Sequence, residues 1–238
     1  MFGQVNYIAL DADDTLWENE IYFHETEDQL ANLLKSLSTK EKTIDTLYHT
    51  EMNNIPYYGF GIKGFTLSMI ETALKLTGEK AGIPGLSCSE MIKKILNLGK
   101  SQLMKPVNII DGVVEVLDII SKKFCLIVAT KGDLLDQERK LEKSGIAHYF
   151  HHIEVMSDKK EENYLKLLNH LDCRPEQFLM VGNSIRSDIL PVLNIGAYAV
   201  NIPFHITWKH EESDETIENE RFIKLESIKE LPRILNCR

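Results

Sequence analysis

The sequence has no long basic tract and no long apolar run, and each absence excludes a class of protein. Its formal net charge is −9, whereas a protein that binds a nucleic-acid backbone is expected to present a basic face. No apolar run approaches the length that spans a bilayer. We therefore expect neither a nucleic-acid partner nor a membrane partner.

Cysteine is also scarce, and the chain has neither an internal repeat nor a low-complexity segment. The four cysteines are scattered without a CxxC pair, which argues against a disulfide scaffold and against a zinc site. The N-terminus lacks a basic region followed by a long apolar stretch and a cleavage site, so we predict no signal peptide. A reducing compartment fits these features best, and we expect a cytoplasmic protein.

What the sequence does contain is an alternation of strand and helix patterns. Its 238 residues, 43% of them hydrophobic, are enough for one large core or for a core with an insertion. After residue 106 the alternation gives right-handed crossovers and a parallel sheet with helices on both faces. We predict strands at residues 5–10, 124–130, 153–155, 178–181 and 197–202. The expected fold class is α/β, with a three-layer, Rossmann-like parallel sheet core.

A helical segment interrupts this pattern after the first strand. No strand is predicted between Trp17 and Lys105, so the insertion is expected to be all-helical. Helical spacing recurs there at residues 18–38, 42–52, 65–76 and 89–98. We therefore predict a core made of residues 1–16 and 106–238, with an inserted domain at residues 17–105.

Three carboxylates, Asp11, Asp13 and Asp14, follow the first predicted strand. Strand ends of this kind are where open α/β sheets bind ligands. Carboxylates this close repel one another unless a cation neutralises them, and a divalent metal is the expected cation. Asp11 and Asp13 would project to the same side of a continuing strand. That geometry suits a nucleophile working beside an acid/base.

Further polar groups follow the later predicted strands. Thr130 ends the second strand, Lys159 and Lys160 follow the third, and residues 182–188 follow the fourth. In a parallel sheet these loops meet at one edge, so residues distant in sequence converge there. Carboxylates, a hydroxyl, an ammonium and a polar loop opened by glycine indicate a site for phosphate and magnesium.

In this order the segments resemble the four motifs of the haloacid dehalogenase (HAD) superfamily. Residues 11–15 match the first motif, DxDxT, and Thr130 matches the second, a Ser or Thr at a strand end. The third motif is a Lys, which Lys159 matches better than Lys160. The fourth, an acidic GDxxxxD-type loop, matches residues 182–188. The helical insertion resembles the C1-type cap of the family.

The resemblance implies roles for the motif residues. Asp11 is expected to attack phosphorus and form an aspartyl-phosphate. Asp13 is expected to protonate the leaving oxygen and then to deprotonate the hydrolytic water. Thr130, with Lys131 beside it, is expected to bind the substrate phosphoryl group, and Lys159 to neutralise charge in the transition state.

The resemblance also implies a Mg²⁺ cofactor, bound by Asp11, the Asp13 carbonyl and the fourth motif. In that motif Asn183 stands where the family usually has Asp. Asn offers an oxygen ligand without charge, so Mg²⁺ affinity is expected to fall unless Asp188 compensates. Which of Asn183 and Asp188 contacts the ion directly is open.

Some of the other segments have two possible interpretations, and the rest are not expected to take part in catalysis or binding. The loop predicted at Tyr57–Gly64 either closes over the substrate, with Lys63 binding an anionic or polar group, or simply connects two helices. Trp17 either lines the substrate pocket or packs the hinge of the insertion. Residues 211–215 are expected to form a solvated loop. Four histidines are expected to be ordinary surface residues, namely His151, His152, His205 and His210.

Asp13 favours a phosphate ester over an organohalide as the substrate, because a halide leaving group needs no proton. We predict a magnesium-dependent hydrolase acting on the phosphate monoester of a small metabolite. A phosphomutase on the same site is one alternative. A catalytically impaired binding or regulatory protein of the same fold is another, which Asn183 alone favours. The particular substrate and the oligomeric state are not predicted.

Overall fold

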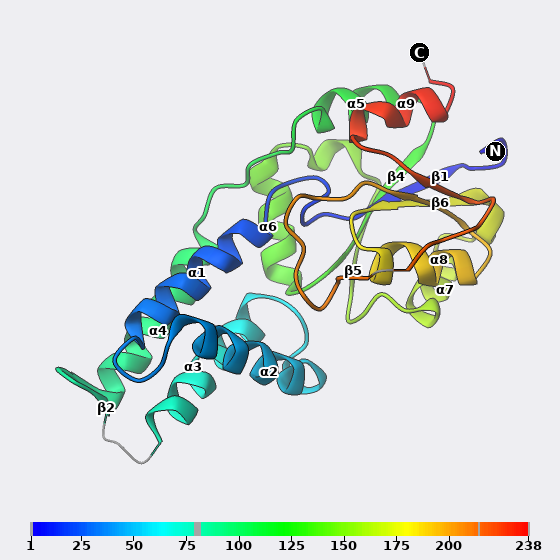
Figure 1. Cartoon of the computed structure of the whole chain (residues 1–238). Coiled ribbons are helices and arrows are strands. Elements are labelled where there is room, and N and C mark those ends of the chain that lie inside the picture. Colours follow the sequence, from blue (N-terminus) through cyan, green and yellow to red (C-terminus); the bar gives the residue numbers. More distant parts are fainter. Residues whose placement is uncertain (1, 79–81, 214, 238) are drawn as a thin grey trace. The chain divides into compact units, whose positions relative to one another are not determined.

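The computed structural model describes residues 2–78, 82–213 and 215–237 (Figure 1). The chain divides into two compact units. One unit contains residues 1–20 and 107–238, and the other contains residues 21–106. Each unit is described by itself below.

The first unit is built on a six-stranded parallel sheet with the strand order β5-β4-β1-β6-β7-β8. The strands are β1 (Tyr7–Leu10), β4 (Cys125–Lys131), β5 (His152–Met156), β6 (Phe178–Gly182), β7 (Tyr198–Asn201) and β8 (Phe222–Lys224). The predicted parallel sheet is confirmed. Because β1 pairs with β4 on one side and with β6 on the other, the segment that follows it lies at the middle of the carboxyl edge.

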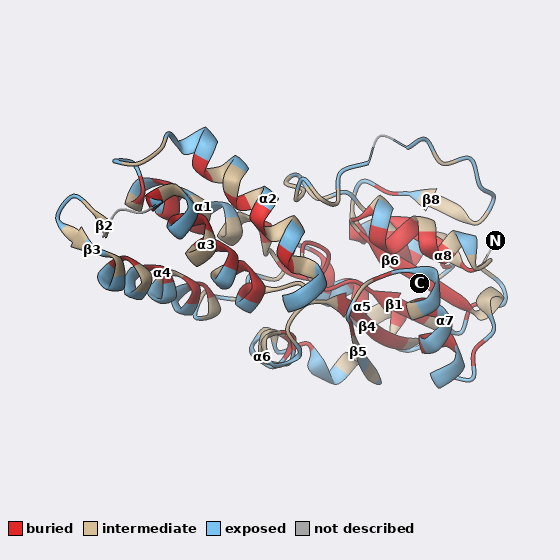
Figure 2. Cartoon of the chain, turned by 90° about the horizontal axis from the view of Figure 1, so that it is seen from below, coloured by how far each residue is buried: buried red, intermediate tan, exposed pale blue. Residues whose placement is uncertain are grey.

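Helices cover both faces of this sheet, which makes the three layers predicted. In β1, Ile8 and Leu10 pack in one core cluster while Ala9 packs in another, because side chains alternate along a strand. The first cluster includes residues of α5, α6 and α9, and the second includes residues of α7 and α8. Figure 2 shows the buried residues concentrated along the strands. The helices are α5 (Val113–Ile120), α6 (Leu134–Ser144), α7 (Glu161–His170), α8 (Leu190–Asn194) and α9 (Leu231–Ile234).

Short helical turns complete this unit, and two of its elements differ from the sequence-based expectation. Strand β8 was missed because it has three residues, none of them buried. The π-helical turn at Ile185–Ile189 was not expected either; it directly follows the polar loop at the end of β6 and precedes α8, which begins at Leu190. The 3₁₀ turns are Ala147–Tyr149, Pro175–Gln177 and Ile228–Glu230.

Over its described residues, the second unit contains four long helices around their own core. They are α1 (Glu20–Leu33), α2 (Lys40–Tyr58), α3 (Ile62–Thr77) and α4 (Cys88–Leu103). Their apolar faces meet in a cluster that includes Leu30, Leu47, Phe65, Met69 and Ile95. Over the residues that the structure describes, no helix combines the length and the apolar character needed to cross a membrane.

A small antiparallel hairpin corrects the expectation that this segment has no strand. Gly82–Ile83 (β2) pairs with Leu86–Ser87 (β3), and Pro84-Gly85 forms the turn between them. Gly85 has φ +77°, and Pro followed by such a glycine is the signature of a type II turn. Strands of two residues carry no periodic pattern, so only the Pro-Gly pair marked this hairpin in the sequence.

The predicted Tyr57–Gly64 loop is also shorter than expected. Helix α2 continues to Tyr58 and α3 begins at Ile62, so Lys63 lies in the first turn of a helix. Gly59 (φ +71°) and Gly61 (φ +105°) make the tight connection possible, because residues other than glycine rarely adopt these backbone angles.

Candidate active site

Asp11 lies directly after β1 and is buried. Its backbone N–H donates to the Val181 carbonyl at 2.9 Å, which continues the contact with β6 for one more residue. One carboxylate oxygen accepts a hydrogen bond from Lys159 Nζ, and the other accepts from Thr15 Oγ1 at 3.4 Å. The side chain is therefore fixed at the carboxyl edge of the sheet.

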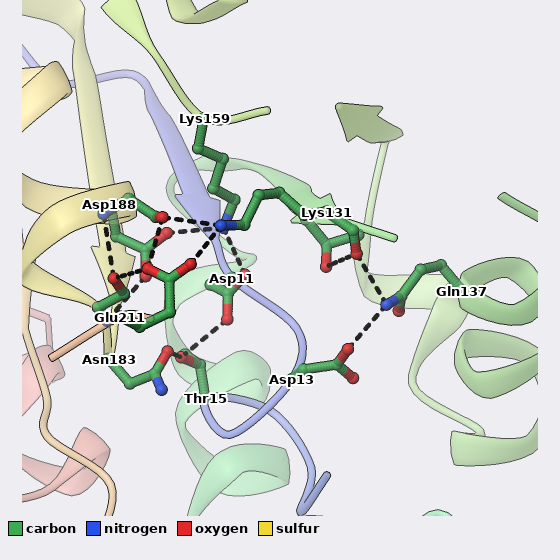
Figure 3. A network of polar contacts seen from close by, with 12 residues as sticks. Asp11, Asp13, Thr15, Lys131, Gln137, Lys159, Asn183, Asp188 and Glu211 are labelled. Atoms are coloured by element: carbon green, nitrogen blue, oxygen red, sulfur yellow. Dashed lines mark hydrogen bonds and ion pairs between the residues drawn. The ribbon is translucent and has the colours of Figure 1, made fainter. Parts of the chain in front are cut away.

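Lys159 bridges two buried carboxylates (Figure 3). Its Nζ donates to Asp11 and, at 2.6 Å, to Asp188 Oδ1, and its side chain is 2% exposed. The neighbouring Lys160 side chain is 66% exposed and pairs with Asp158 at 2.9 Å. Of the two candidate lysines, the structure thus brings Lys159 to the carboxylates and leaves Lys160 at the surface.

The loop after β6 places Asp188 against its own backbone. Asp188 Oδ2 accepts from the Ser184 N–H at 3.0 Å. A Cβ atom at Gly182 would lie 2.2 Å from the same oxygen, so this close approach requires glycine. The π-helical turn supplies the extra residue that lets Asp188 reach back to the strand end, and such turns are frequent at functional sites.

Asn183 joins this group through Thr15. The Thr15 hydroxyl lies 3.4 Å from both Asn183 Oδ1 and Asp11 Oδ2, so the two oxygens converge from different strand ends (Figure 3). The buried Asn201 amide donates to the Asn183 carbonyl at 2.9 Å and holds the loop in place. Thr15 was identified only as part of a motif, and the structure gives it this connecting position.

The charge balance of the group is unfavourable without a further cation. Burial raises the pKa of Asp11 to about 7; Lys159 opposes this rise, and Asp188 adds to it. A nucleophilic carboxylate must be ionised near neutral pH, so additional positive charge beside it is favourable. Hard oxygen donors such as those of Asp11, Asn183 and Asp188 are the ligands that Mg²⁺ prefers. The residue set therefore fits Mg²⁺.

Thr130 and Lys131 stand at the end of the neighbouring strand β4. Thr130 is buried and its hydroxyl donates to the Lys131 carbonyl at 3.2 Å. Lys131 Nζ donates to Ser187 Oγ at 2.9 Å and to the Glu211 carboxylate. The structure thus ties the second-motif loop to the fourth-motif loop.

Glu211 is an exception to the expectation that residues 211–215 form a solvated loop, since Glu212, Ser213 and Glu215 are exposed and Asp214 lies outside the described residues. Its side chain is 12% exposed and accepts hydrogen bonds from Lys131, from Ser184 Oγ at 2.5 Å and from Ser187 Oγ at 2.6 Å. Burial alone would raise the pKa of Glu211, but Lys131 and the serine hydroxyls outweigh burial and lower it to about 2. No sequence signal marked this residue, because it lies in an irregular acidic stretch.

The Asp13 side chain does not face the same partners as Asp11. Strand β1 ends at Leu10, so the two residues do not lie on a continuing strand as expected. Figure 3 shows Asp13 turned toward Gln137, whose Nε2 donates to Asp13 Oδ2 at 2.8 Å. Asp13 Oδ1 accepts from Trp17 Nε1 at 2.7 Å and from Lys140 Nζ at 2.9 Å.

Trp17 and Lys140 are both enclosed around this carboxylate. Trp17 is buried in the core of the first unit with its indole N–H on Asp13, which is a role that neither sequence interpretation gave it. Burial disfavours the charged form of Lys140, but Asp13 and Asp136 outweigh burial, so the pKa of Lys140 is raised. Lys140 is therefore a permanent cation beside Asp13.

Asp14 has a structural position. It adopts φ +62°, and its carboxylate accepts from the backbone N–H groups of Asn19 at 2.8 Å and Glu20 at 3.1 Å, where α1 begins. Burial raises the pKa of Asp14 to about 7, although these N–H groups oppose the rise. Lys63, the remaining predicted substrate contact, is exposed on α3 in the helical unit, and its role stays a prediction.

The order of these loops along one sheet edge agrees with the family comparison. Residues 5–196 match the family model described as haloacid dehalogenase-like hydrolase, and the chain therefore belongs to that family.

Individual relatives are similar either to part of this chain or to nearly all of it. A haloacid dehalogenase-like family hydrolase from Xanthomonas campestris is similar in structure, with 33% identity, a TM-score of 0.85, and coverage of 98% of this chain and 91% of that one. The glyceraldehyde 3-phosphate phosphatase of Methanothermobacter thermautotrophicus is 33% identical over 97 residues, which is 38% of this chain and 42% of that protein. Human N-acylneuraminate-9-phosphatase is 26% identical over 120 residues, 48% of each. The matches thus span less than half the length of both curated relatives.

Proposed function

We propose that the protein is a magnesium-dependent phosphatase that hydrolyses the phosphate monoester of a small metabolite. The observation that carries the proposal is the buried Lys159 ammonium between Asp11 and Asp188, beside the oxygens of Thr15 and Asn183. The partial matches to two phosphatases support the same chemistry. The scattered cysteines, which form no CxxC pair, support a cytoplasmic location.

In the proposed reaction Asp11 attacks phosphorus. A bond forms between an Asp11 oxygen and phosphorus while the ester P–O bond breaks, and the electron pair goes to the leaving oxygen, which Asp13 protonates. Water then attacks the phosphorus of the aspartyl-phosphate and gives a proton to Asp13. The bond to Asp11 breaks and releases inorganic phosphate.

The remaining residues stabilise charge in this scheme. Lys159 neutralises negative charge near the attacked phosphoryl group, and the Thr130 hydroxyl and Lys131 bind its oxygens. The side chains of Asp11, Asn183 and Asp188 and the Asp13 carbonyl would hold Mg²⁺. When bound, that ion supplies positive charge that shields the approaching anions from one another.

The helical segment completes the proposal. We assign residues 17–105 the role of a cap that selects the substrate, with Lys63 as one residue that contacts an anionic or polar group. The names of the two related phosphatases give phosphorylated small molecules as their substrates, which supports a substrate of that class here.

Phosphate release from a panel of phosphorylated metabolites and from p-nitrophenyl phosphate, with and without Mg²⁺, tests the function. We expect turnover that requires the metal and is abolished in D11N. Isomerised product without inorganic phosphate would identify a phosphomutase instead.

Asn183 stands where the family usually has Asp, and this difference favours a second candidate, a non-catalytic binding protein of the same fold. That candidate predicts no turnover and no Mg²⁺ binding at millimolar concentration. The Mg²⁺ titration of the isolated protein therefore separates the two.

A further inference from the structure

The Asp13 carboxylate is surrounded by hydrogen-bond donors that lie outside the four motifs. Trp17 Nε1 (2.7 Å) and Lys140 Nζ (2.9 Å) donate to Oδ1, and Gln137 Nε2 (2.8 Å) donates to Oδ2. The Asp13 side chain stays 24% exposed. Both oxygens are thus fixed by the protein while part of the carboxylate remains open to solvent. We call Trp17, Gln137 and Lys140 the Asp13 cradle.

Two members of the cradle come from one face of α6, since Gln137 and Lys140 are three residues apart on that helix. Gln137 Nε2 also donates to the Lys131 carbonyl at 3.0 Å. One amide group therefore connects the carboxylate of Asp13 to the end of β4, where Thr130 lies. Helix α6 fixes these two parts of the site with respect to each other.

The cradle contains features that are unfavourable for the stability of the fold. Gln137 Oε1 is buried and has no hydrogen-bond partner among the residues that the structure describes. A buried acceptor without a hydrogen-bond partner destabilises the folded state. Lys140 is also mostly enclosed, with Asn19 Oδ1 at 2.7 Å as a further contact. Violations of this kind are expected where a side chain must be held in place for function.

We propose that Lys140, Gln137 and Trp17 are positioning residues for the acid/base, acting on the leaving group through Asp13. This inference rests on the proposed function. A general acid works only when its oxygen reaches the leaving oxygen, and a displacement of about 1 Å costs roughly 10²-fold in rate. The cradle sets that position. Removing one of its members should therefore slow the reaction most for substrates whose leaving group needs a proton.

Two aryl phosphates of similar shape separate this role from a general structural one. p-Nitrophenyl phosphate releases a weakly basic phenolate that needs little protonation, whereas phenyl phosphate releases a more basic one. For K140M we expect kcat/KM to fall about 10²-fold on phenyl phosphate and less than about 10-fold on p-nitrophenyl phosphate. K140R should recover part of the loss. K143M, which removes an exposed lysine of the same helix, should change neither value.

A double-mutant cycle tests whether Lys140 acts through Asp13. D13N should show the same leaving-group pattern as K140M, and D13N/K140M should be no slower than D13N alone. Equal losses on both substrates, or multiplied losses in the double variant, would overturn the inference. If K140M does not fold, Q137M provides the same comparison. Wild-type protein inactive on both substrates would instead reject the proposed function.

A separate cluster lies on the edge strand β5. His152 and Glu154 are two residues apart, so their side chains share one face, and His152 Nε2 lies 2.9 Å from Glu154 Oε2. His170, in the last turn of α7, packs its ring edge-on against His152 with ring centroids 5.0 Å apart. One ligand atom from each of the three residues lies within 4.8 Å of the others. His152, expected to be an ordinary surface residue, thus has two potential co-ligands.

We infer that this cluster binds a borderline transition metal such as Zn²⁺. Two imidazoles and one carboxylate are a ligand set that Zn²⁺ uses, with bond lengths of about 2.0–2.2 Å. Because the His152 and Glu154 side chains are about one-third exposed, small rotations bring all three atoms around an ion that enters from solvent. The metal would join the edge strand to the end of α7.

Thermal unfolding with micromolar Zn²⁺, in the presence of excess Mg²⁺, tests this second inference. We expect Zn²⁺ to raise Tm of the wild type and of H148A, a control that removes an exposed histidine outside the cluster. In H170A the Zn²⁺ concentration needed for the same rise should increase about 10-fold or more. Identical Zn²⁺ responses in H170A and the wild type, or no response in the wild type, would overturn it.

Discussion

Asp11 is held by residues from strand-end loops, whereas Asp13, two residues along the chain, is held largely by one face of a helix. We call the first group the nucleophile side, which consists of Asp11, Thr15, Lys159, Asn183 and Asp188. The acid/base side consists of Asp13 and its cradle. On the nucleophile side, Lys159 is shared between two buried carboxylates, Asp11 and Asp188. On the acid/base side, Lys140 pairs with Asp13 and, at 3.7 Å, with Asp136, and Asp13 also accepts from two neutral donors. The Asp13 carboxylate is therefore hydrogen-bonded on both oxygens by neutral as well as charged donors, whereas Asp11 depends on one shared ammonium and one hydroxyl.

The largest effect is expected on the nucleophile side from K159M. The substitution leaves Asp11 and Asp188 buried without their shared cation, so activity should fall about 10³-fold. Removing one partner of a buried ion pair also costs about 3–5 kcal/mol, and Tm should fall as well. Steady-state kinetics and thermal unfolding measure both. The exposed neighbour provides the control, since K160M should behave like the wild type; equal losses in both variants would contradict the assignment of Lys159.

The Glu211 carboxylate is expected to make the stability of the fold depend on pH. Its pKa is lowered in the folded state, to about 2, from the ordinary value of 4.5. Its stabilising contribution is therefore complete above pH 4.5 and is lost as pH falls toward 2. By linkage this amounts to about 3 kcal/mol.

Denaturant unfolding of E211Q and the wild type across this pH range measures the contribution of Glu211. The difference should be largest near neutral pH and should shrink below pH 4.5. E212Q, at an exposed acid of the same stretch, should show no difference. A gap between E211Q and the wild type that is constant with pH would show that Glu211 does not act as an ionised partner of Lys131.

On the acid/base side, W17F keeps an aromatic ring in the core but removes the N–H on Asp13. A hydrogen bond to a charged group contributes about 1.5–3 kcal/mol, so kcat/KM on phenyl phosphate should fall about 10-fold or more. The KM for Mg²⁺ should not change, because the Asp13 side chain is not among the proposed metal ligands. A change in metal affinity of the same size would mean that the two sides are not separable.

The smallest expected effect comes from restoring charge with N183D. An additional carboxylate beside Asp11 should strengthen Mg²⁺ binding by roughly threefold to tenfold, because ligand charge tunes the affinity of such sites. Mg²⁺ titration of activity measures this affinity. Unchanged affinity in N183D would show that residue 183 is not a metal ligand.

The contrast between the two sides also explains what could be predicted from the sequence. Residues of the nucleophile side follow strands directly, and an apolar run that ends in polar residues marks such a position. The same rule located Thr130 at the end of β4. It did not separate Lys159 from Lys160, because neighbouring residues in a loop differ in direction, which only the backbone at the start of α7 determines.

The acid/base side and Glu211 left no comparable pattern. Gln137 and Lys140 belong to a polar helix face, and helical spacing says which residues share a face but not what that face contacts. Glu211 reaches Lys131 from 80 residues away through an irregular segment. Short elements such as β2, β3 and β8 are missed for a simpler reason, since two or three residues carry no periodicity.

The proposed role of Asp11 has one direct test, which is the covalent intermediate. Wild-type protein mixed with substrate and Mg²⁺, quenched in acid and digested, should carry phosphate on the peptide that contains Asp11. On p-nitrophenyl phosphate, whose leaving group needs little protonation, D13N should accumulate more of it, because the loss of the base slows hydrolysis of the aspartyl-phosphate, and D11N should carry none. Substrate turnover with no phosphate on that peptide in either the wild type or D13N, or with phosphate on a different residue, would contradict the account.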